Sequence, residues 1–112
     1  MQYSGIVQKG GRRAASFGFP TVNIPLEDTK VAGVYAAKVR IGDQEYEAVA
    51  FADQSRRILE AHVLDFTADL YGWNIKIELL KKIRNRKKFK DDEALKRAIA
   101  EDITAVRQYF SS

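Results

Sequence analysis

The sequence predicts a mainly β fold, in which short strands form a compact β-barrel or curled sheet and one C-terminal α-helix packs against it. Residues 33–41 and 46–51 are rich in β-branched and aromatic side chains, which favour strands. Residues 74–79 alternate polar and apolar side chains, the period of a half-buried strand. After Phe89 the apolar residues recur at steps of three and four, the spacing of one helix face. Short strands followed by a single helix indicate a barrel or curled sheet covered on one side.

The N-terminal part of the chain is expected to contain short extended segments separated by loops. Residues 5–7 begin a β-like segment. Residues 9–16 contain glycines and arginines without periodicity, which predicts a loop. Residues 22–25 form a short extended piece, and the polar residues 26–32 are expected to connect it to the next strand.

The middle of the chain predicts a β-hairpin and two further strands. Residues 33–41 and 46–51 are the arms of the hairpin, and residues 42–45 are its turn. Residues 58–66 alternate less cleanly, but they are bounded by polar residues and have the length of a strand. The strand that begins at residue 74 is expected to continue beyond residue 79.

The C-terminal segment predicts one amphipathic helix. Asp91, Asp92 and Glu93 suit its start, where backbone N–H groups are unpaired and the helix dipole favours negative charge. Asp102 falls within the apolar stripe, and we interpret it as the edge of the stripe rather than as a partner of a polar group on the sheet. The apolar stripe consists of Leu95, Ala98, Ile99, Ile103, Val106 and Phe110.

The composition bounds the class of protein. The chain has 112 residues, which we interpret as one domain spanning residues 1–112. It has no cysteine, which excludes disulfides, thiolate nucleophiles and cysteine-based zinc or iron–sulfur sites. No apolar run approaches the roughly 20 residues needed to cross a bilayer, and the polar residues 1–4 do not resemble a signal peptide. We therefore expect a cytoplasmic protein without membrane contact.

The positive charge is concentrated in one segment. The formal net charge is +4 and the sequence pI is about 9.4. This segment could bind nucleic acid or the phosphates of a nucleotide, or it could be a solvated strand end and loop. The cationic residues in it are Lys81, Lys82, Arg84, Arg86, Lys87, Lys88 and Lys90.

The run from Gly18 to Asn23 is either an ordinary turn before a strand or part of a metal site. Pro20 fixes its own φ and pushes Phe19 towards an extended conformation. Thr21 and Asn23 then project from the same side of the chain and present two neutral oxygen atoms. Mg²⁺ prefers such oxygen ligands together with substrate phosphates. On this second interpretation, residues 18–23 belong to a site that binds the phosphates of a nucleotide.

Glu60 is the candidate base for a phosphoryl transfer. It stands between apolar Leu59 and Ala61, where a carboxylate has a desolvation cost unless it has a partner or a task. Transfer of a phosphoryl group to a hydroxyl needs charge neutralisation at the phosphate and a carboxylate that takes the proton. His62, the only histidine, would share the face of Glu60, and we interpret it as structural.

Taken together, these residues resemble the riboflavin kinase (flavokinase) family, and nearly the whole chain matches it in order. The resemblance is most specific in the second and fourth of the matching segments. These segments are residues 5–7, 18–24, 33–36, 60–66, 70–72, 83–84 with 88–89, and 95–102.

The resemblance implies a six-stranded antiparallel Greek-key β-barrel with a C-terminal α-helix. It also implies transfer of the ATP γ-phosphate to the ribityl 5′-hydroxyl of riboflavin, which gives FMN and ADP. Glu60 would be the base, Thr21 and Asn23 would meet Mg²⁺ or another divalent ion, and Arg84 with its loop would cover the flavin. The residues expected to contact substrate or nucleotide are Gly5, Gly10, Gly18, Pro20, Thr21, Asn23, Tyr71, Arg84 and Phe89.

Three departures from the family pattern bear on activity. Ala14 and Ala15 stand where the family usually has Gly-Arg. Residues 50–57 are shorter than the corresponding family segment and lack its Asn-Ile-Gly and Pro-Thr. Arg86 occupies a position where the family often has glutamate. A divergent kinase and a flavin- or nucleotide-binding relative without catalysis therefore both remain open.

The expected partners are small molecules: riboflavin, FMN, ATP and ADP. A basic barrel that binds nucleic acid is a further alternative, but Tyr35, Tyr46, Phe51 and Phe66 lie in core-like segments and do not form a visible stacking platform. We expect a monomer. Because no adenylyltransferase segment precedes residue 1, we expect the chain to stop at FMN, unless it is a piece of a longer protein.

Overall fold

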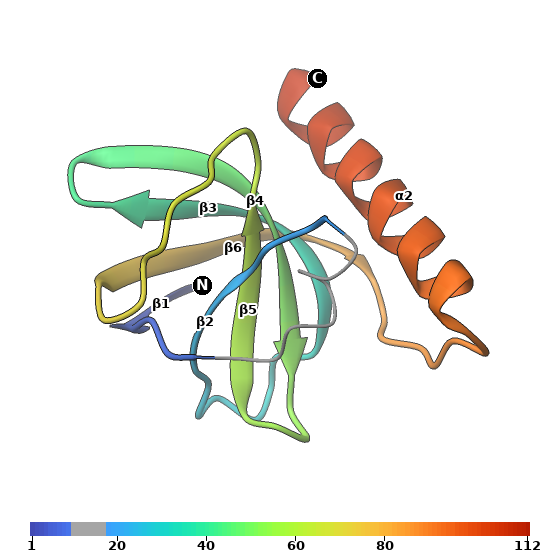
Figure 1. The fold of residues 1–112 in the computed structure, drawn as a ribbon, viewed down its shortest axis with the longest axis horizontal. Helices are drawn as coiled ribbons and strands as arrows, with labels where there is room; N and C mark the ends of the chain where they lie inside the picture. Colours follow the sequence, from blue (N-terminus) through green and yellow to red (C-terminus); the bar gives the residue numbers. More distant parts are fainter. Residues whose placement is uncertain (10–17) are drawn as a thin grey trace.

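The computed structural model describes residues 1–9 and 18–112, which form a mainly β domain with one helix near the C-terminus (Figure 1). Asp91 caps the helix, since its side chain accepts a hydrogen bond of 2.8 Å from the backbone N–H of Ala94. The elements are β1 (Gln2–Ile6), β2 (Val22–Pro25), β3 (Gly33–Ile41), β4 (Gln44–Asp53), β5 (Ile58–Val63), β6 (Asn74–Arg84) and α2 (Asp92–Ser111).

The strands form one antiparallel sheet in the order β1-β6-β3-β4-β5-β2. Three consecutive strands, β3 to β5, are followed by β6, which returns to pair with β3, and this is the Greek-key arrangement. The sheet curls until its edges meet, where the N–H of Gln8 donates to the carbonyl of Asn23 at 3.0 Å. This nearly closed barrel with one C-terminal helix confirms the predicted fold class.

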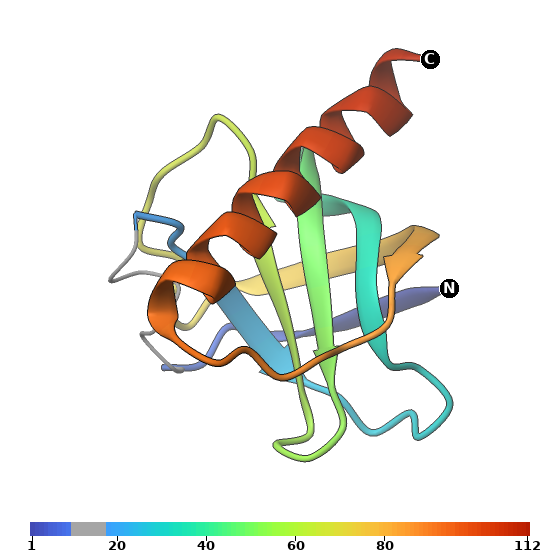
Figure 2. The same ribbon diagram turned by 90° about the vertical axis from the view of Figure 1, so that its right-hand side faces the viewer.

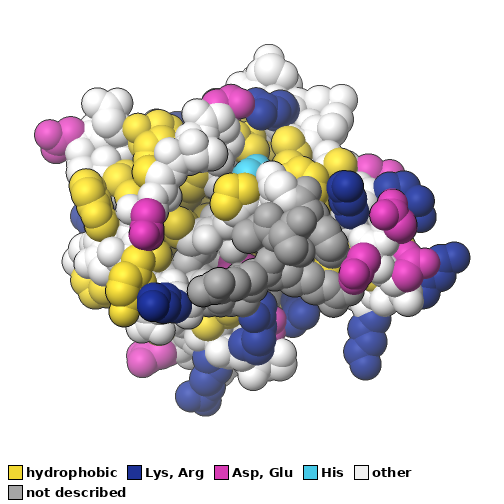
Figure 3. Space-filling view, in the orientation of Figure 1, with side chains coloured by type: hydrophobic (Ala, Val, Ile, Leu, Met, Phe, Trp, Pro, Cys, Tyr) yellow, Lys and Arg dark blue, Asp and Glu magenta, His cyan; other side chains and the backbone are white. Residues whose placement is uncertain are grey.

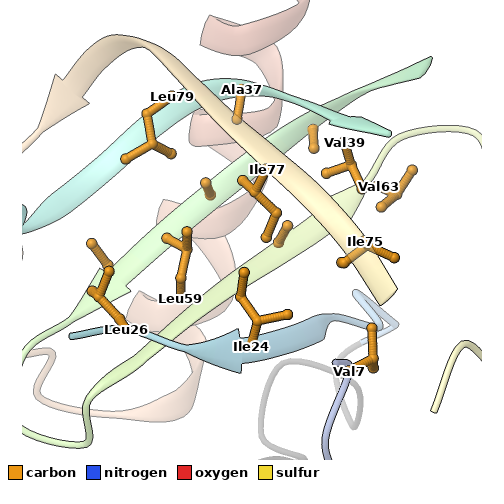
Figure 4. Packing of buried hydrophobic residues seen from close by; sticks show 14 of the residues in the cluster. Val7, Ile24, Leu26, Ala37, Val39, Leu59, Val63, Ile75, Ile77 and Leu79 are labelled. Carbon is orange, nitrogen blue, oxygen red and sulfur yellow. The ribbon is translucent and has the colours of Figure 1, made fainter. Parts of the chain in front are cut away.

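The barrel encloses the main hydrophobic core (Figure 4). Alternate residues point inward along each strand, as in Leu59, Ala61 and Val63 of β5, so the neighbouring Glu60 and His62 lie on the outer face. The largest fully buried side chains of this core are Ile24, Leu26, Val31, Val39, Leu59, Ile75 and Ile77.

A second, smaller core lies between the outer face of the sheet and α2, which crosses the outside of the barrel in Figure 2. Val106 from the helix packs there against Val34 and Val49 from β3 and β4. The strands beneath the helix are therefore buried on both faces. Within the part of the chain that the structure describes, no helix is long and apolar enough to span a membrane.

The element boundaries differ from the predictions at several strand ends. The first strand begins at Gln2 and ends at Ile6, whereas residues 5–7 were expected to start it. The hairpin turn consists of Gly42 and Asp43 alone, because Ile41 pairs directly with Gln44 and Gly42 adopts a φ of +61°. Strand β5 ends at Val63, not at residue 66, since the chain turns at Asp65 with a φ of +57°.

Candidate active site

A cavity of about 430 Å³ lies outside the barrel, between the outer faces of β3 to β5, the first turns of α2 and the segment of residues 85–91 that joins β6 to the helix. Figure 2 shows this segment running past the strand ends below the start of α2. The described residues that line the cavity are Thr21, Val34, Phe51, Asp53, Arg56, Glu60, Arg84, Arg86, Lys87, Lys88, Phe89, Leu95 and Ile99.

The strand register brings Thr21, Asn23 and Glu60 together; Thr21 and Glu60 line this cavity, whereas Asn23 is 3% exposed and is not among its lining residues. Asn23 on β2 pairs directly with Glu60 on β5, so the two side chains share the outer face. Thr21 lies two residues before Asn23, and its hydroxyl donates a hydrogen bond of 3.1 Å to Oε2 of Glu60. The three residues singled out in the sequence for phosphate chemistry are therefore neighbours in space.

Glu60 has a charged partner as well as Thr21. Its Oε1 accepts a hydrogen bond of 2.5 Å from Nη2 of Arg56, which lies in the turn between β4 and β5. The side chain of Glu60 is 12% exposed, whereas that of Arg56 is 51% exposed. The carboxylate is thus nearly enclosed, whereas its counter-ion is half exposed and also lines the cavity.

Asp53 connects this turn to the segment after β6. Its carboxylate accepts hydrogen bonds of 2.8 Å from Nε of Arg56 and 2.8 Å from Nη1 of Arg86, and further bonds from the hydroxyl and backbone N–H of Ser55. Burial alone would raise the pKa of Asp53, but the hydrogen bonds from Arg56 and Ser55 and the charge of Arg86 outweigh it and hold that pKa well below its usual range. Asp53 is therefore ionised at neutral pH.

Arg84 is fixed at another wall of the cavity by Asp102. Its Nε and Nη2 bond the two carboxylate oxygens of Asp102 at 2.8 and 2.7 Å. Asp102 is only 3% exposed, so its interpretation as the edge of the helix stripe is wrong; it is the buried partner of a polar group from the sheet. The Arg84 guanidinium also lies 5.7 Å from the ring centre of Phe89, which lines the same cavity.

Of the nine residues predicted to contact substrate or nucleotide, five described ones do not line this cavity and one lies outside the described residues; besides Asn23 and Pro20 these are Gly5, Gly18, Tyr71 and Gly10. Gly5 of β1 packs under Ile24, and a Cβ there would lie 3.2 Å from the Ile24 Cβ, so its place in the fold is explained by packing. Gly18 is exposed with a φ of +88°. Tyr71 is 58% exposed. Gly10 lies outside the described residues.

Pro20 contributes its backbone rather than its ring. Its carbonyl oxygen lies 2.8 Å from Nδ1 of His62, which requires the imidazole proton on Nδ1. Phe19 meets the His62 ring edge to face, with 5.8 Å between ring centres. These contacts agree with a structural role for His62, which anchors the segment leading to Thr21 on strand β5.

Asp53 and Arg56 were not among the predicted site residues. The local signal was present, because an aspartate before a tight turn commonly caps the backbone of that turn. Their long-range partners were not readable, since Arg86 lies 33 residues after Asp53 in the sequence. Of the predicted basic cluster, Arg84, Arg86, Lys87 and Lys88 line the cavity.

Charged side chains gather over the helix and in the lining of the cavity. Figure 3 shows acidic and basic side chains intermixed over α2, whereas apolar and neutral side chains dominate the opposite end of that face. Within residues 1–9 and 18–112, the cavity is lined by the cations Arg56, Arg84, Arg86, Lys87 and Lys88, against the carboxylates Asp53 and Glu60. This excess of positive charge suits an anionic ligand.

The Thr21 hydroxyl beside Glu60 is an oxygen of the kind that binds a hard divalent cation which shares its ligands with a phosphate. Thr21 uses its hydroxyl hydrogen on Glu60, which leaves the lone pairs of the oxygen available. Among the described residues, no group of three histidine, cysteine, aspartate or glutamate side chains is arranged to hold a metal ion. In proteins, Mg²⁺ is typically bound by a few protein oxygen atoms, and the phosphates of the substrate complete its coordination shell.

Comparison with known proteins identifies the family. The family model described as flavokinase, riboflavin kinase, matches residues 1–110. The chain belongs to the riboflavin kinase family. Curated relatives named bifunctional riboflavin kinase/FMN adenylyltransferase are 39% identical in Escherichia coli (strain K12) and 32% identical in Bacillus subtilis (strain 168). Each alignment covers 96% of this chain but only 37% and 38% of the relative, so the chain spans little over a third of their length.

Solved structures share the fold of the riboflavin kinase domain. A crystal structure named riboflavin kinase from Trypanosoma brucei aligns with a TM-score of 0.76 over 99% of this chain and 77% of that chain, at 22% identity. A Streptococcus pneumoniae structure named a macrolide-efflux protein aligns with a TM-score of 0.82 at 29% identity, over 95% of this chain and 38% of that chain. The fold of this family therefore occurs both in chains of similar size and as part of longer ones.

Proposed function

We propose that this domain transfers the γ-phosphate of ATP to the 5′-hydroxyl of riboflavin, forming FMN and ADP. The observation that carries the proposal is the cluster of Thr21, Asn23 and Glu60 beside a cavity in whose lining cations outnumber carboxylates. Membership of the riboflavin kinase family supports the choice of substrates. In the reaction a new O–P bond forms at the ribityl oxygen while the bond between the β,γ-bridging oxygen and the γ-phosphorus breaks.

Glu60 would accept the proton that the 5′-hydroxyl loses. Its position on a strand gives it a fixed direction, and the hydrogen bond from Thr21 to Oε2 holds the carboxylate plane. Because the side chain is only 12% exposed, water competes little for its oxygens. A positioned carboxylate of this kind contributes typically about 10²- to 10⁴-fold to the rate.

Thr21 and Asn23 would hold Mg²⁺ or another divalent ion through their side-chain oxygens. When bound, the ion neutralises negative charge on the phosphate oxygens. Arg84 and Phe89 would lie on the flavin side. Arg84 is suited to this role because Asp102 fixes its guanidinium in one orientation, which lowers the entropy lost when a ligand binds.

The apolar part of the cavity suits the flat ring system of a flavin. Val34 and Phe51 belong to the sheet wall, Leu95 and Ile99 to the helix wall, and Phe89 to the segment between β6 and α2. Apolar walls with a few fixed polar groups are usual in sites for small molecules. The cavity thus offers cations for phosphate groups and apolar walls for an aromatic ring system.

FMN formation from riboflavin and MgATP tests the proposal, with the flavins separated by chromatography. Turnover that depends on both substrates supports the kinase. Tight binding of riboflavin or nucleotide without any FMN would support instead a binding module that lacks catalysis. This alternative is favoured by one observation, since both carboxylate oxygens of Glu60 are already engaged in the structure.

A further inference from the structure

Glu60 cannot take a proton at Oε1 while Arg56 occupies that oxygen. Oε2 is held by the Thr21 hydroxyl at 3.1 Å and Oε1 by Nη2 of Arg56 at 2.5 Å. If Glu60 is the base, the pair with Arg56 has to open before or during the reaction.

Arg56 is placed so that its guanidinium can reach a ligand in the cavity. It lies in the four-residue turn between β4 and β5, its side chain is 51% exposed, and it lines the cavity. The other half of the pair is enclosed, since the Glu60 side chain is 12% exposed, so the pair opens only when a ligand takes up the charge of Arg56, and Glu60 then keeps the hydrogen bond from Thr21. The half-exposed guanidinium can therefore exchange one anionic partner for another.

Asp53 does not depend on Arg56 alone. If Arg56 moves away, the carboxylate of Asp53 keeps the bond of 2.8 Å from Arg86 and the bonds from the hydroxyl and backbone N–H of Ser55. The turn thus remains capped, and the charge of Asp53 keeps Arg86 as its partner. The other arginines of the cavity are held differently: Arg84 is fixed by Asp102, and Arg86 is bonded to Asp53.

We propose that Arg56 moves from Glu60 to the phosphate of bound nucleotide. In the resting state Arg56 neutralises Glu60; with nucleotide present it neutralises the transferring phosphoryl group and leaves Oε1 free for the proton of the flavin hydroxyl. The planar guanidinium suits this exchange, since it binds carboxylate and phosphate oxygens with the same geometry. The proposal rests on the proposed kinase function and adds a phosphate-binding residue to it.

The test measures nucleotide affinity in a background where the pair with Glu60 has already been removed. The probe is AMP-PNP with Mg²⁺, titrated by calorimetry into Glu60→Gln and into the double variant Glu60→Gln/Arg56→Gln. If Arg56 binds phosphate, we expect the double variant to bind about tenfold more weakly or worse, as for the loss of one charge-assisted hydrogen bond. Equal affinity of the two variants would overturn the proposal, because Arg56 would then pair with Glu60 and make no contact with the phosphate.

A matched control and a second measurement guard against misfolding and unspecific charge effects. Glu60→Gln/Arg57→Gln removes the same charge from the neighbouring exposed residue, which does not line the cavity, and should keep the affinity of Glu60→Gln. In the unsubstituted protein, the Nε–H resonance of Arg56, assigned with Arg56→Lys, should shift when AMP-PNP binds. A resonance that stays unchanged at saturating nucleotide would overturn the proposal even if Arg56→Gln fails to fold.

The outcomes separate this proposal from the kinase function. A domain that forms FMN and binds AMP-PNP equally well with and without Arg56 remains a kinase, and only the role of Arg56 is lost. A domain that binds AMP-PNP through Arg56 but forms no FMN keeps the phosphate contact and loses the kinase. Failure of the unsubstituted domain to bind AMP-PNP at all would overturn both.

Discussion

Arg84 and Asp102 form a two-point ion pair that joins the end of β6 to the middle of α2, with N–O distances of 2.8 and 2.7 Å. The side chain of Asp102 is 4% exposed and that of Arg84 is 24% exposed. The helix therefore contributes more than an apolar stripe to the barrel. It supplies the anion that orients an arginine at the wall of the candidate active site.

Removal of this anion should affect both stability and ligand binding. For Asp102→Asn we expect a loss of about 2 to 3 kcal/mol in the free energy of unfolding, because hydrogen bonds between charged groups are lost and Arg84 remains without its partner. Urea denaturation followed by circular dichroism measures this loss. Glu101→Gln, on the exposed neighbour of Asp102, should change stability by less than about 0.5 kcal/mol. Equal effects of the two changes would show that the pair contributes nothing.

Gly33 is required where β3 passes close to the end of β6. It adopts a φ of +111°, and a Cβ there would lie 2.7 Å from the carbonyl oxygen of Arg84. We expect Gly33→Ala to lower the free energy of unfolding by about 1 to 3 kcal/mol, and riboflavin affinity with it, because the backbone of Arg84 must shift. Gly42→Ala is the control, since Gly42 also has a positive φ but open space around it. Its stability loss should be smaller and its riboflavin affinity unchanged.

The carboxylate of Asp53 should make stability depend on acid pH. Its folded-state pKa lies below the unfolded value of about 3.9, so its contribution is present above that value and is lost as the pH falls through the folded pKa. We expect Asp53→Asn to be less stable than the unsubstituted domain at pH 7, with a difference that shrinks below about pH 4. Thermal unfolding at pH 7, 5 and 3 measures this. A difference that is the same at all three values would contradict the charged interaction with Arg56 and Arg86.

Local sequence patterns predicted the bounds of those strands and helices that are set by residues close together in the sequence. The bounds of β3 (Gly33–Ile41) and β2 (Val22–Pro25) agree with prediction, because β-branched residues and a preceding proline act within a few residues. The helix also begins where its acidic residues and cap indicate. Strand ends such as Val63 were missed, since they depend on where a neighbouring strand stops pairing.

The candidate site was predicted in part. Thr21, Asn23 and Glu60 were grouped from their chemistry and from family resemblance, and the register of β2 against β5 places them side by side. Asp53 was not predicted, because its partner Arg86 lies 33 residues away in the sequence. Asp102 was interpreted wrongly, because its partner Arg84 lies 18 residues away. Ion pairs over such separations become visible only once the sheet and helix are assembled.

The role of Glu60 is tested most directly by the rate of FMN formation in Glu60→Gln at saturating riboflavin and MgATP. We predict a fall in kcat of about 10²-fold or more without weaker binding of riboflavin or AMP-PNP, because the amide cannot accept the hydroxyl proton. Glu45→Gln, on the exposed glutamate that lies 3.8 Å from Arg40, is the control and should leave kcat unchanged. A Glu60→Gln domain that forms FMN within about threefold of the normal rate would contradict the assignment of Glu60 as the base.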